Sequence, residues 1–101
     1  MTPSKFKQIV NAQLAECKNI LSLREEIYGS DGDRLDNFKR VCVGTRTTSQ
    51  HVLMNLVGKQ WDALNLAVVQ NRPMDDNYVE WITDIINYML LLKGLLLEKE
   101  E

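Results

Sequence analysis

Apolar side chains recur every three or four residues along most of this chain, which is the spacing of an amphipathic α-helix. The pattern predicts three long helices and one short helix. The long helices are expected over residues 3–28, from 47–49 to about 70, and from 75–76 to about 98, and the short one over 36–43. No segment alternates strictly between apolar and polar residues as a strand does. The sequence therefore predicts an all-α, four-helix bundle that forms a single domain over residues 1–101.

The residues that flank these segments are typical of helix ends. Thr2 suits an N-cap, and Pro3 stands at the first helical position, where its missing N–H costs nothing. Gly29 and Gly44 can end the first and second helices. Pro73 separates the third helix from the fourth.

The second half of the last segment is apolar around its whole circumference. A helix of that kind is buried, and four helices of this length cannot cover it fully. We therefore expect copies of the chain to form a homo-oligomer through residues 89–97. The apolar run is too short, and too often interrupted by polar residues, to span a membrane.

One face of the same segment carries a polar stripe, spaced by four, four and three residues: Asp76, Glu80, Asp84 and Asn87. This spacing gathers the side chains on one side of a helix. Because the stripe continues into the apolar half, its last members need a cation or hydrogen-bond partners. Two interpretations stay open, a polar cleft or a solvated face near a helix N-terminus, where the helix dipole favours acids.

The third segment repeats this spacing with a second polar stripe: His51, Asn55, Lys59 and Asp62. If the two stripes face each other, Lys59 approaches Glu80 and Asp84. Such a contact would be either a structural salt bridge or part of a phosphate–metal site. In the second case the carboxylates would hold Mg²⁺ and the lysine would neutralise phosphate oxygens.

Several other residues in the last two long segments allow two interpretations. Gly58 weakens a helix and is expected to permit the close approach of another helix or of a ligand. Trp61, Tyr78 and Trp81 lie among aliphatic residues, which is typical of core positions, although they would also stack on a base.

Composition narrows the classes of partner and compartment. The chain is 45% hydrophobic and 26% charged, as in ordinary globular domains, and its net charge of −2 argues against general binding to nucleic acid or anionic membranes. Cys17 and Cys42 form no CxxC pair and are typical of thiols in a reducing compartment. The N-terminus lacks the apolar core of a signal peptide. We expect a cytoplasmic protein.

Four short segments resemble known proteins: residues 26–29 (EIYG), 36–40 (DNFKR), 54–59 and 76–88. They are similar to small phage and bacterial helical domains of the MazG-like and nucleotide-modification-associated families, which are related to the all-α NTP pyrophosphohydrolases. The most specific shared pieces are the Tyr28–Gly29 turn, the single lysine Lys59 and the Asp84-x-x-Asn87-Tyr88 pattern. The resemblance also suggests a bacterial or phage-infected cell as the setting.

The resemblance implies a nucleotide site within a helical bundle, often assembled across an oligomer. In catalytic members, acidic motifs on two helices hold Mg²⁺, and water attacks the link between the α and β phosphates to release pyrophosphate and a monophosphate. The implied metal ligands here are Asp76, Glu80 and Asp84. The implied catalytic residues are Glu80, Asp84 and Lys59. Further candidate contacts to the nucleotide are Tyr28, Asn37, Arg40 and Asn87.

Two departures from the family pattern favour binding over hydrolysis. Glu80 and Asp84 are four residues apart, where the family motif has three. Glu25 and Glu26 match only part of the first acidic motif, because Gly29 stands where a third glutamate is expected. The sequence thus predicts a nucleotide-binding domain, with Mg²⁺-dependent hydrolysis of (d)NTP as a possible activity. The alternative is a non-catalytic phage-type protein, either a nucleotide sequesterer or a protein-binding inhibitor.

Overall fold

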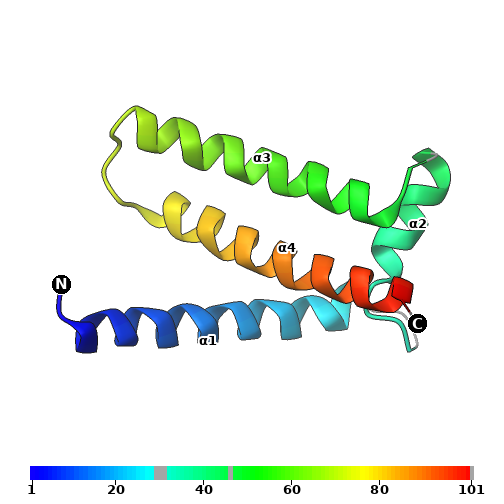
Figure 1. Cartoon of the computed structure of the whole chain (residues 1–101), viewed down its shortest axis with the longest axis horizontal. Helices are drawn as coiled ribbons and strands as arrows, with labels where there is room; N and C mark the ends of the chain where they lie inside the picture. The colour runs from blue at the N-terminus through cyan, green and yellow to red at the C-terminus, as the bar shows by residue number, and fades with distance from the viewer. Residues whose placement is uncertain (29–31, 46, 101) are drawn as a thin grey trace.

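The computed structural model of the chain describes residues 1–28, 32–45 and 47–100, except for the side chains of residues 27, 28, 44, 45, 99 and 100. These residues form four helices (Figure 1): α1 (Pro3–Tyr28), α2 (Asp36–Thr45), α3 (Ser49–Val69) and α4 (Asp76–Glu100). The predicted all-α fold with three long helices and one short helix is therefore confirmed. No helix in the described ranges is both long enough and apolar enough to cross a membrane.

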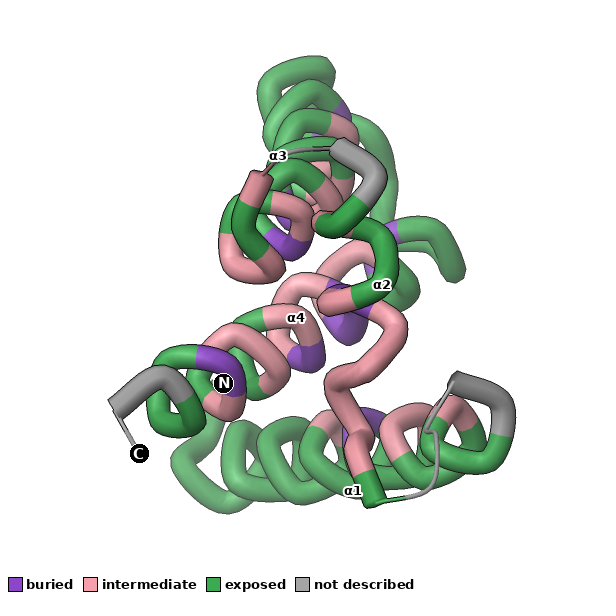
Figure 2. The backbone as a smooth tube through the Cα atoms, turned by 90° about the vertical axis from the view of Figure 1, so that its right-hand side faces the viewer, coloured by how far each residue is buried: buried purple, intermediate pink, exposed green. Residues whose placement is uncertain are grey.

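The central element of the bundle is α4. It packs most extensively against α3, and α1 packs against it on the side away from α3 (Figures 1 and 2). The short helix α2 packs against α3, near the end of the molecule where α4 finishes. Three of the four helices therefore meet at that end, and α1 reaches it with its last turns.

The hydrophobic core lies where α2, α3 and α4 meet. Its buried centre consists of one residue from each helix, Phe38, Leu53 and Leu95. The half-buried side chains packed around this centre are Leu35, Val52, Leu56, Tyr88, Leu91 and Leu92. Figure 2 shows that buried positions are concentrated on the helix faces turned toward α4, whereas much of α1 is exposed.

Side chains cap three helices. Thr2 Oγ1 accepts a hydrogen bond from the Lys5 N–H at 3.1 Å, so the predicted N-cap of α1 is confirmed. Thr48 caps α3 in the same way, with its Oγ1 3.1 Å from the His51 nitrogen. At the start of α4, Asp75 Oδ1 accepts from the backbone N–H groups of residues 77 and 78. These bonds satisfy backbone donors that have no partner inside a helix.

The connection between α3 and α4 is a compact turn. Asn71 has a φ of 55°, and its N–H donates to the Val68 carbonyl at 3.0 Å, while the Arg72 N–H donates to Ala67. This is the Schellman pattern that ends a helix. Tyr78 then donates its hydroxyl to the Arg72 carbonyl at 2.8 Å, which ties the turn to α4.

Three expectations differ from the structure. The short helix α2 continues through Gly44 to Thr45, two residues beyond the predicted end, which is within the usual variation of helix boundaries. A Cβ at Gly58 would meet no atom within 4 Å, so this glycine serves no close contact in the chain. Trp61 is 59% exposed, so it lies outside the core.

The other two aromatic residues are partly or fully covered. Tyr78 is buried, and Trp81 is half-buried beside it. Their ring centroids are 5.8 Å apart with an interplanar angle of 66°, an edge-to-face contact. The core interpretation is therefore confirmed for Tyr78.

Candidate functional site

A cavity of about 90 Å³, which we call the junction cavity, lies where α1 and α2 approach α3 and α4. It is lined by Arg24 of α1, Arg34 just before α2, Asn37 and Phe38 of α2, Leu56 of α3, and Tyr88 and Leu91 of α4. Residues from all four helices thus form one small site. Its lining residues include two arginines, one asparagine and two aromatic residues.

The turn before α2 is held in place by a side chain of its own. Asp33 Oδ1 accepts from the Leu35 N–H at 3.0 Å, and its other oxygen lies 2.7 Å from Lys39 Nζ. These two hydrogen bonds lower the pKa of Asp33, the one from Lys39 having the larger effect. Arg34 therefore lines the cavity from a turn whose backbone is held in place by these two hydrogen bonds of Asp33.

Lys39 connects this turn to the last helix. Its ammonium group pairs with Asp33 and also with Glu98 near the end of α4. Hydrogen bonds to these two carboxylates raise the pKa of Lys39 well above its usual range. We call this group the Asp33–Lys39–Glu98 clamp, and it fixes the start of α2 against α4, beside the junction cavity.

The acidic stripe of α4 does run into the interior, but only in its second half. Asp84 and Asn87 are 8% and 5% exposed, whereas Asp76 and Glu80 are exposed. The solvated-face interpretation therefore applies to the first two residues, and the buried interpretation applies to the last two.

Asp84 faces α1. Its Oδ1 is 3.9 Å from Arg24 Nη2, which makes a long ion pair. Burial raises the pKa of Asp84; the charge of Arg24 works against this shift, and that of Glu80 adds to it. Arg24 thus serves two groups at once, because it lines the junction cavity and also faces the buried carboxylate.

Two amide side chains near the cavity have unused hydrogen-bonding atoms. Within the described chain, neither Asn87 Nδ2 nor Asn87 Oδ1 has a partner, and Asn37 Oδ1 also has none. On α4, Asn87 directly precedes Tyr88 of the cavity wall. A buried polar atom without a partner costs about 1–3 kcal/mol. Native proteins rarely leave such atoms alone, so a ligand or an ordered water is the expected partner.

The polar stripe of α3 does not face the acidic stripe. His51, Asn55, Lys59 and Asp62 are all exposed. Lys59 comes two residues after the buried Val57, and two helical positions differ by about 200° around the axis. The two side chains therefore point to nearly opposite sides of α3. In the described chain, the ion-pair partner of Asp84 is consequently Arg24, and Lys59 pairs with neither Glu80 nor Asp84.

The remaining candidates lie apart from this arrangement. Arg40 is exposed and pairs with Asp36 at 3.0 Å on the surface of α2, so it does not line the cavity. The side chain of Tyr28 falls outside the described residues. Sequence reasoning had found Asn37, but it missed Arg24 and Arg34. The available signal for Arg24 was its position on the covered face of α1, seven residues after the buried Cys17.

No cage for a metal ion exists among the described residues, since no group of three or more His, Cys, Asp or Glu side chains gathers there. Mg²⁺ does not need such a cage, because proteins typically hold it with one or two carboxylates plus substrate phosphates. Glu80 and Asp84, one helical turn apart, fit that smaller requirement, and a cation would relieve the repulsion between them.

No protein-family model matches the chain, and no curated protein or solved structure matches it. The chemistry of the site must be judged from its own residues. Two guanidinium groups offer forked donors that suit phosphate or carboxylate oxygens. The amides can both donate and accept, as a base or a sugar requires.

Proposed function

We propose that this protein binds a nucleotide or another phosphate-bearing small molecule at the junction cavity. The observation that carries the proposal is the convergence of Arg24 and Arg34 on one small cavity that also holds an unpartnered amide atom of Asn37. Arginine is the residue best suited to bidentate phosphate recognition. The chain is weakly acidic overall, so this local basic lining is a feature of the site rather than of the whole surface.

The size of the cavity limits which part of the ligand enters it. Sites for whole small molecules usually have volumes of about 300–1,000 Å³. The junction cavity is about 90 Å³, so we assign it to a phosphate group held by the two arginines. The rest of the ligand then lies outside the cavity. Asn37, which lines the cavity, is assigned to a ligand hydroxyl that its unpartnered amide oxygen can accept from. Asn87 is buried outside the cavity lining and has no assigned contact to the ligand.

A second candidate function is Mg²⁺-dependent hydrolysis of a (deoxy)nucleoside triphosphate to the monophosphate and pyrophosphate. The observation that favours it is the electrostatic coupling of Glu80 with the buried Asp84 next to Arg24. In this version Glu80 and Asp84 hold the ion, which neutralises phosphate charge, and Asp76 is the next acid along the helix. Lys59, exposed on another face, has no assigned contact to this pair.

The non-catalytic alternative needs only the binding site. A nucleotide sequesterer would bind the same ligands without turnover, and a protein-binding inhibitor would use the surface instead. We also propose that the protein works in the cytoplasm. We propose further that it forms a homo-oligomer, because apolar side chains of α4 such as Met89, Leu96 and Leu97 remain exposed.

Titration calorimetry of the full chain against phosphate, pyrophosphate and a panel of nucleotides, with and without Mg²⁺, tests the proposal. At least one phosphate compound should bind, and Arg34→Ala should weaken it about 10- to 100-fold, the usual loss of a charge-assisted hydrogen bond. Arg72→Ala is the matched control, because Arg72 is exposed in the α3–α4 turn. Absence of binding by every phosphate compound would contradict the proposal.

Pyrophosphate release, measured with the same panel of compounds, distinguishes hydrolysis, sequestration and protein binding. Release that Asp84→Ala abolishes, with helicity retained by circular dichroism, supports hydrolysis. Binding without release supports sequestration. A chain that neither binds nor hydrolyses these compounds supports the protein-binding inhibitor.

A further inference from the structure

The chain exposes more surface than a compact protein of its mass. Its accessible surface is 7601 Å², whereas the usual scaling with mass gives about 5,900 Å² for 11.7 kDa. Its radius of gyration is 15.6 Å, against about 12.7 Å expected for a compact domain of this length. The excess of about 1,700 Å² is comparable with a whole protein–protein interface.

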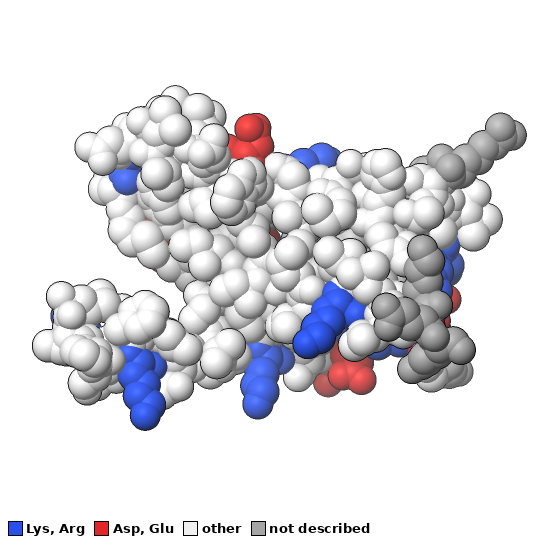
Figure 3. Space-filling view, viewed as in Figure 1, with Lys and Arg blue, Asp and Glu red and all other residues white. Residues whose placement is uncertain are grey.

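The first half of α1 is among the most exposed parts of the described chain. Among residues 3–16 every side chain is exposed except the half-buried Gln13. These include an apolar stripe at helical spacing, which consists of Phe6, Ile9, Val10 and Leu14. Figure 3 shows a hollow at the end of the molecule where Figure 1, in the same view, places the first half of α1. The side chains of this stripe remain 37–58% exposed in a single chain.

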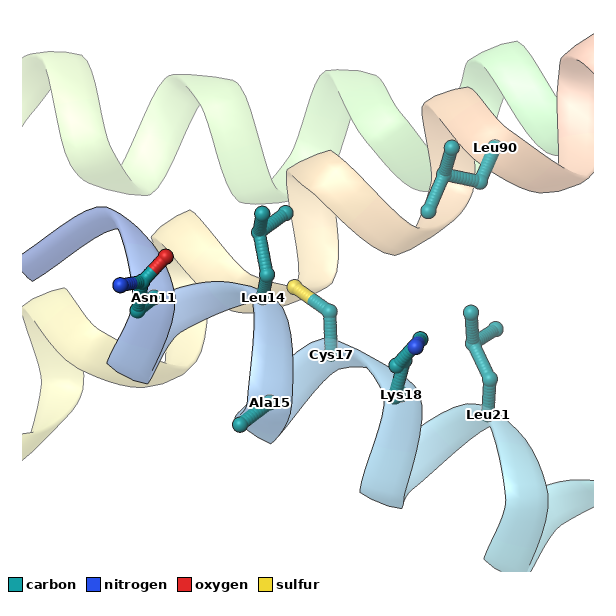
Figure 4. A pocket seen from close by; sticks show the side chains of 7 residues that line it. All are labelled: Asn11, Leu14, Ala15, Cys17, Lys18, Leu21 and Leu90. Atoms are coloured by element: carbon teal, nitrogen blue, oxygen red, sulfur yellow. The ribbon is translucent and has the colours of Figure 1, made fainter. Parts of the chain in front are cut away.

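A groove begins where the stripe ends. It lies between α1 and α4, has a volume of about 400 Å³, and is lined mainly by Leu14, Cys17 and Leu21 of α1 and Leu90 of α4. Figure 4 shows Leu14 and Leu21 on the side of α1 that faces α4, with Leu90 above them. Leu14 and Leu90 are about half exposed, so the groove is open to a helix from outside.

We propose that α1 of a second copy of this chain occupies the groove, with the two α1 helices antiparallel about a two-fold axis near Glu16. With the axis there, the groove-lining segments of the two α1 helices face each other, and the first turns of each stripe lie along the last turns of α1 of the other copy. Such a contact is isologous, since the same surface is used on both sides. It covers an apolar face that the single chain leaves exposed, and the excess surface of the whole chain is larger than the roughly 800 Å² per partner of a standard interface.

Charge along α1 selects the antiparallel arrangement. Lys7 and Glu25 are 18 residues apart, about five full turns, so they lie on the same flank of the helix, at opposite ends. An axis near Glu16 brings Lys7 of one copy opposite Glu25 of the other, and symmetry creates this pair twice. A parallel arrangement would instead place both Lys7 residues at one end of the interface and both Glu25 residues at the other, so this pair could not form. Both side chains are exposed in the single chain and available for these contacts.

Sedimentation of the full chain, from low to high micromolar concentration, tests the interface. We expect a dimer that Leu14→Glu weakens by about 30-fold or more, as a charge at the centre of an interface does. Leu14 is 52% exposed, so the variant should keep its fold, which circular dichroism verifies. Val69→Glu, at an apolar site at the end of α3 that is 73% exposed, is the control and should remain dimeric.

Charge exchange tests the orientation independently. Lys7→Glu and Glu25→Lys should each weaken the dimer, and the double variant should recover the affinity of the original chain. A monomer at all concentrations, or a dimer that Leu14→Glu leaves intact, overturns the interface. Weakening by the single variants without recovery in the double variant overturns the antiparallel arrangement.

Discussion

At the residue scale, Asp84 is the group whose burial has the clearest energetic consequence. Its pKa is raised above the ordinary value of 3.8, first by burial and then by Glu80, while Arg24 opposes the shift. Between pH 3.8 and the raised value, the folded chain holds a proton that the unfolded chain has lost. Ionisation of Asp84 therefore lowers the stability of the folded chain as pH rises through this window.

Asp84→Asn should remove this dependence. At low pH the variant and the original chain should unfold at similar temperatures, and above the raised pKa the variant should be the more stable one. Thermal unfolding followed by circular dichroism across the acidic range gives the difference. Asp62→Asn, which removes an exposed carboxylate, is the control. If the melting temperatures of Asp84→Asn and the original chain changed with pH in parallel, ionisation of the buried Asp84 would not lower the stability of the fold.

Gly58 is a second residue with a definite expectation. A Cβ there would meet nothing within 4 Å, and the position is helical and exposed. Gly58→Ala should therefore raise the free energy of unfolding by about 1 kcal/mol, the difference in helix propensity. Urea denaturation measures it. Gly32→Ala offers a contrast and should destabilise, because Gly32 has a φ of +85°. If Gly58→Ala destabilised as well, a partner would have to approach that face.

At the scale of elements, the Asp33–Lys39–Glu98 clamp joins the start of α2 to the end of α4. Lys39→Met keeps the length of the side chain and removes both ion pairs. We expect faster hydrogen exchange at the start of α2 and in the last turns of α4, together with weaker phosphate binding, because Arg34 loses its fixed backbone. Lys93→Met, an exposed lysine of α4, is the control. If hydrogen exchange at the start of α2 and at the end of α4 were unchanged in Lys39→Met, apolar packing alone would hold these two segments together.

The clamp also has a pH signature. The pKa of Asp33 is lowered below 3.8, so its contribution to stability is present above that value and is lost as pH falls through the lowered pKa. This direction is opposite to that of Asp84. The two groups can therefore be distinguished in the same acid titration, since Lys39→Met should reduce only the loss at the lowest pH.

The helices were predictable from sequence because their ends depend on local chemistry. Thr48 caps a backbone donor three residues ahead, and Asn71 ends α3 through bonds that reach back only a few residues. The site was less predictable, because it depends on how each helix is rotated about its axis. Lys59 repeats the spacing of the acidic stripe, yet the apolar positions beside it turn it to solvent. Arg34 stands outside any periodic segment and lines the cavity from a turn that Asp33 holds by a hydrogen bond to the Leu35 N–H.

At the scale of the whole molecule, stability and assembly should be coupled. A chain with an excess surface of about 1,700 Å² over the compact expectation leaves apolar area that only a partner can remove from water. If the partner is a second copy, only the folded state binds it, so association stabilises the fold by mass action. The melting temperature should then rise with protein concentration.

The dependence of melting temperature on protein concentration, measured for Leu14→Glu, gives the decisive comparison. This variant should melt at a temperature independent of concentration, near the value that the original chain approaches at high dilution, because Leu14 lies outside the buried core and its loss costs the single chain little. Val69→Glu should keep the concentration dependence. If the melting temperatures of all three proteins rose equally with concentration, the stabilising association would not involve the α1 groove. Another face of the bundle would then form the interface.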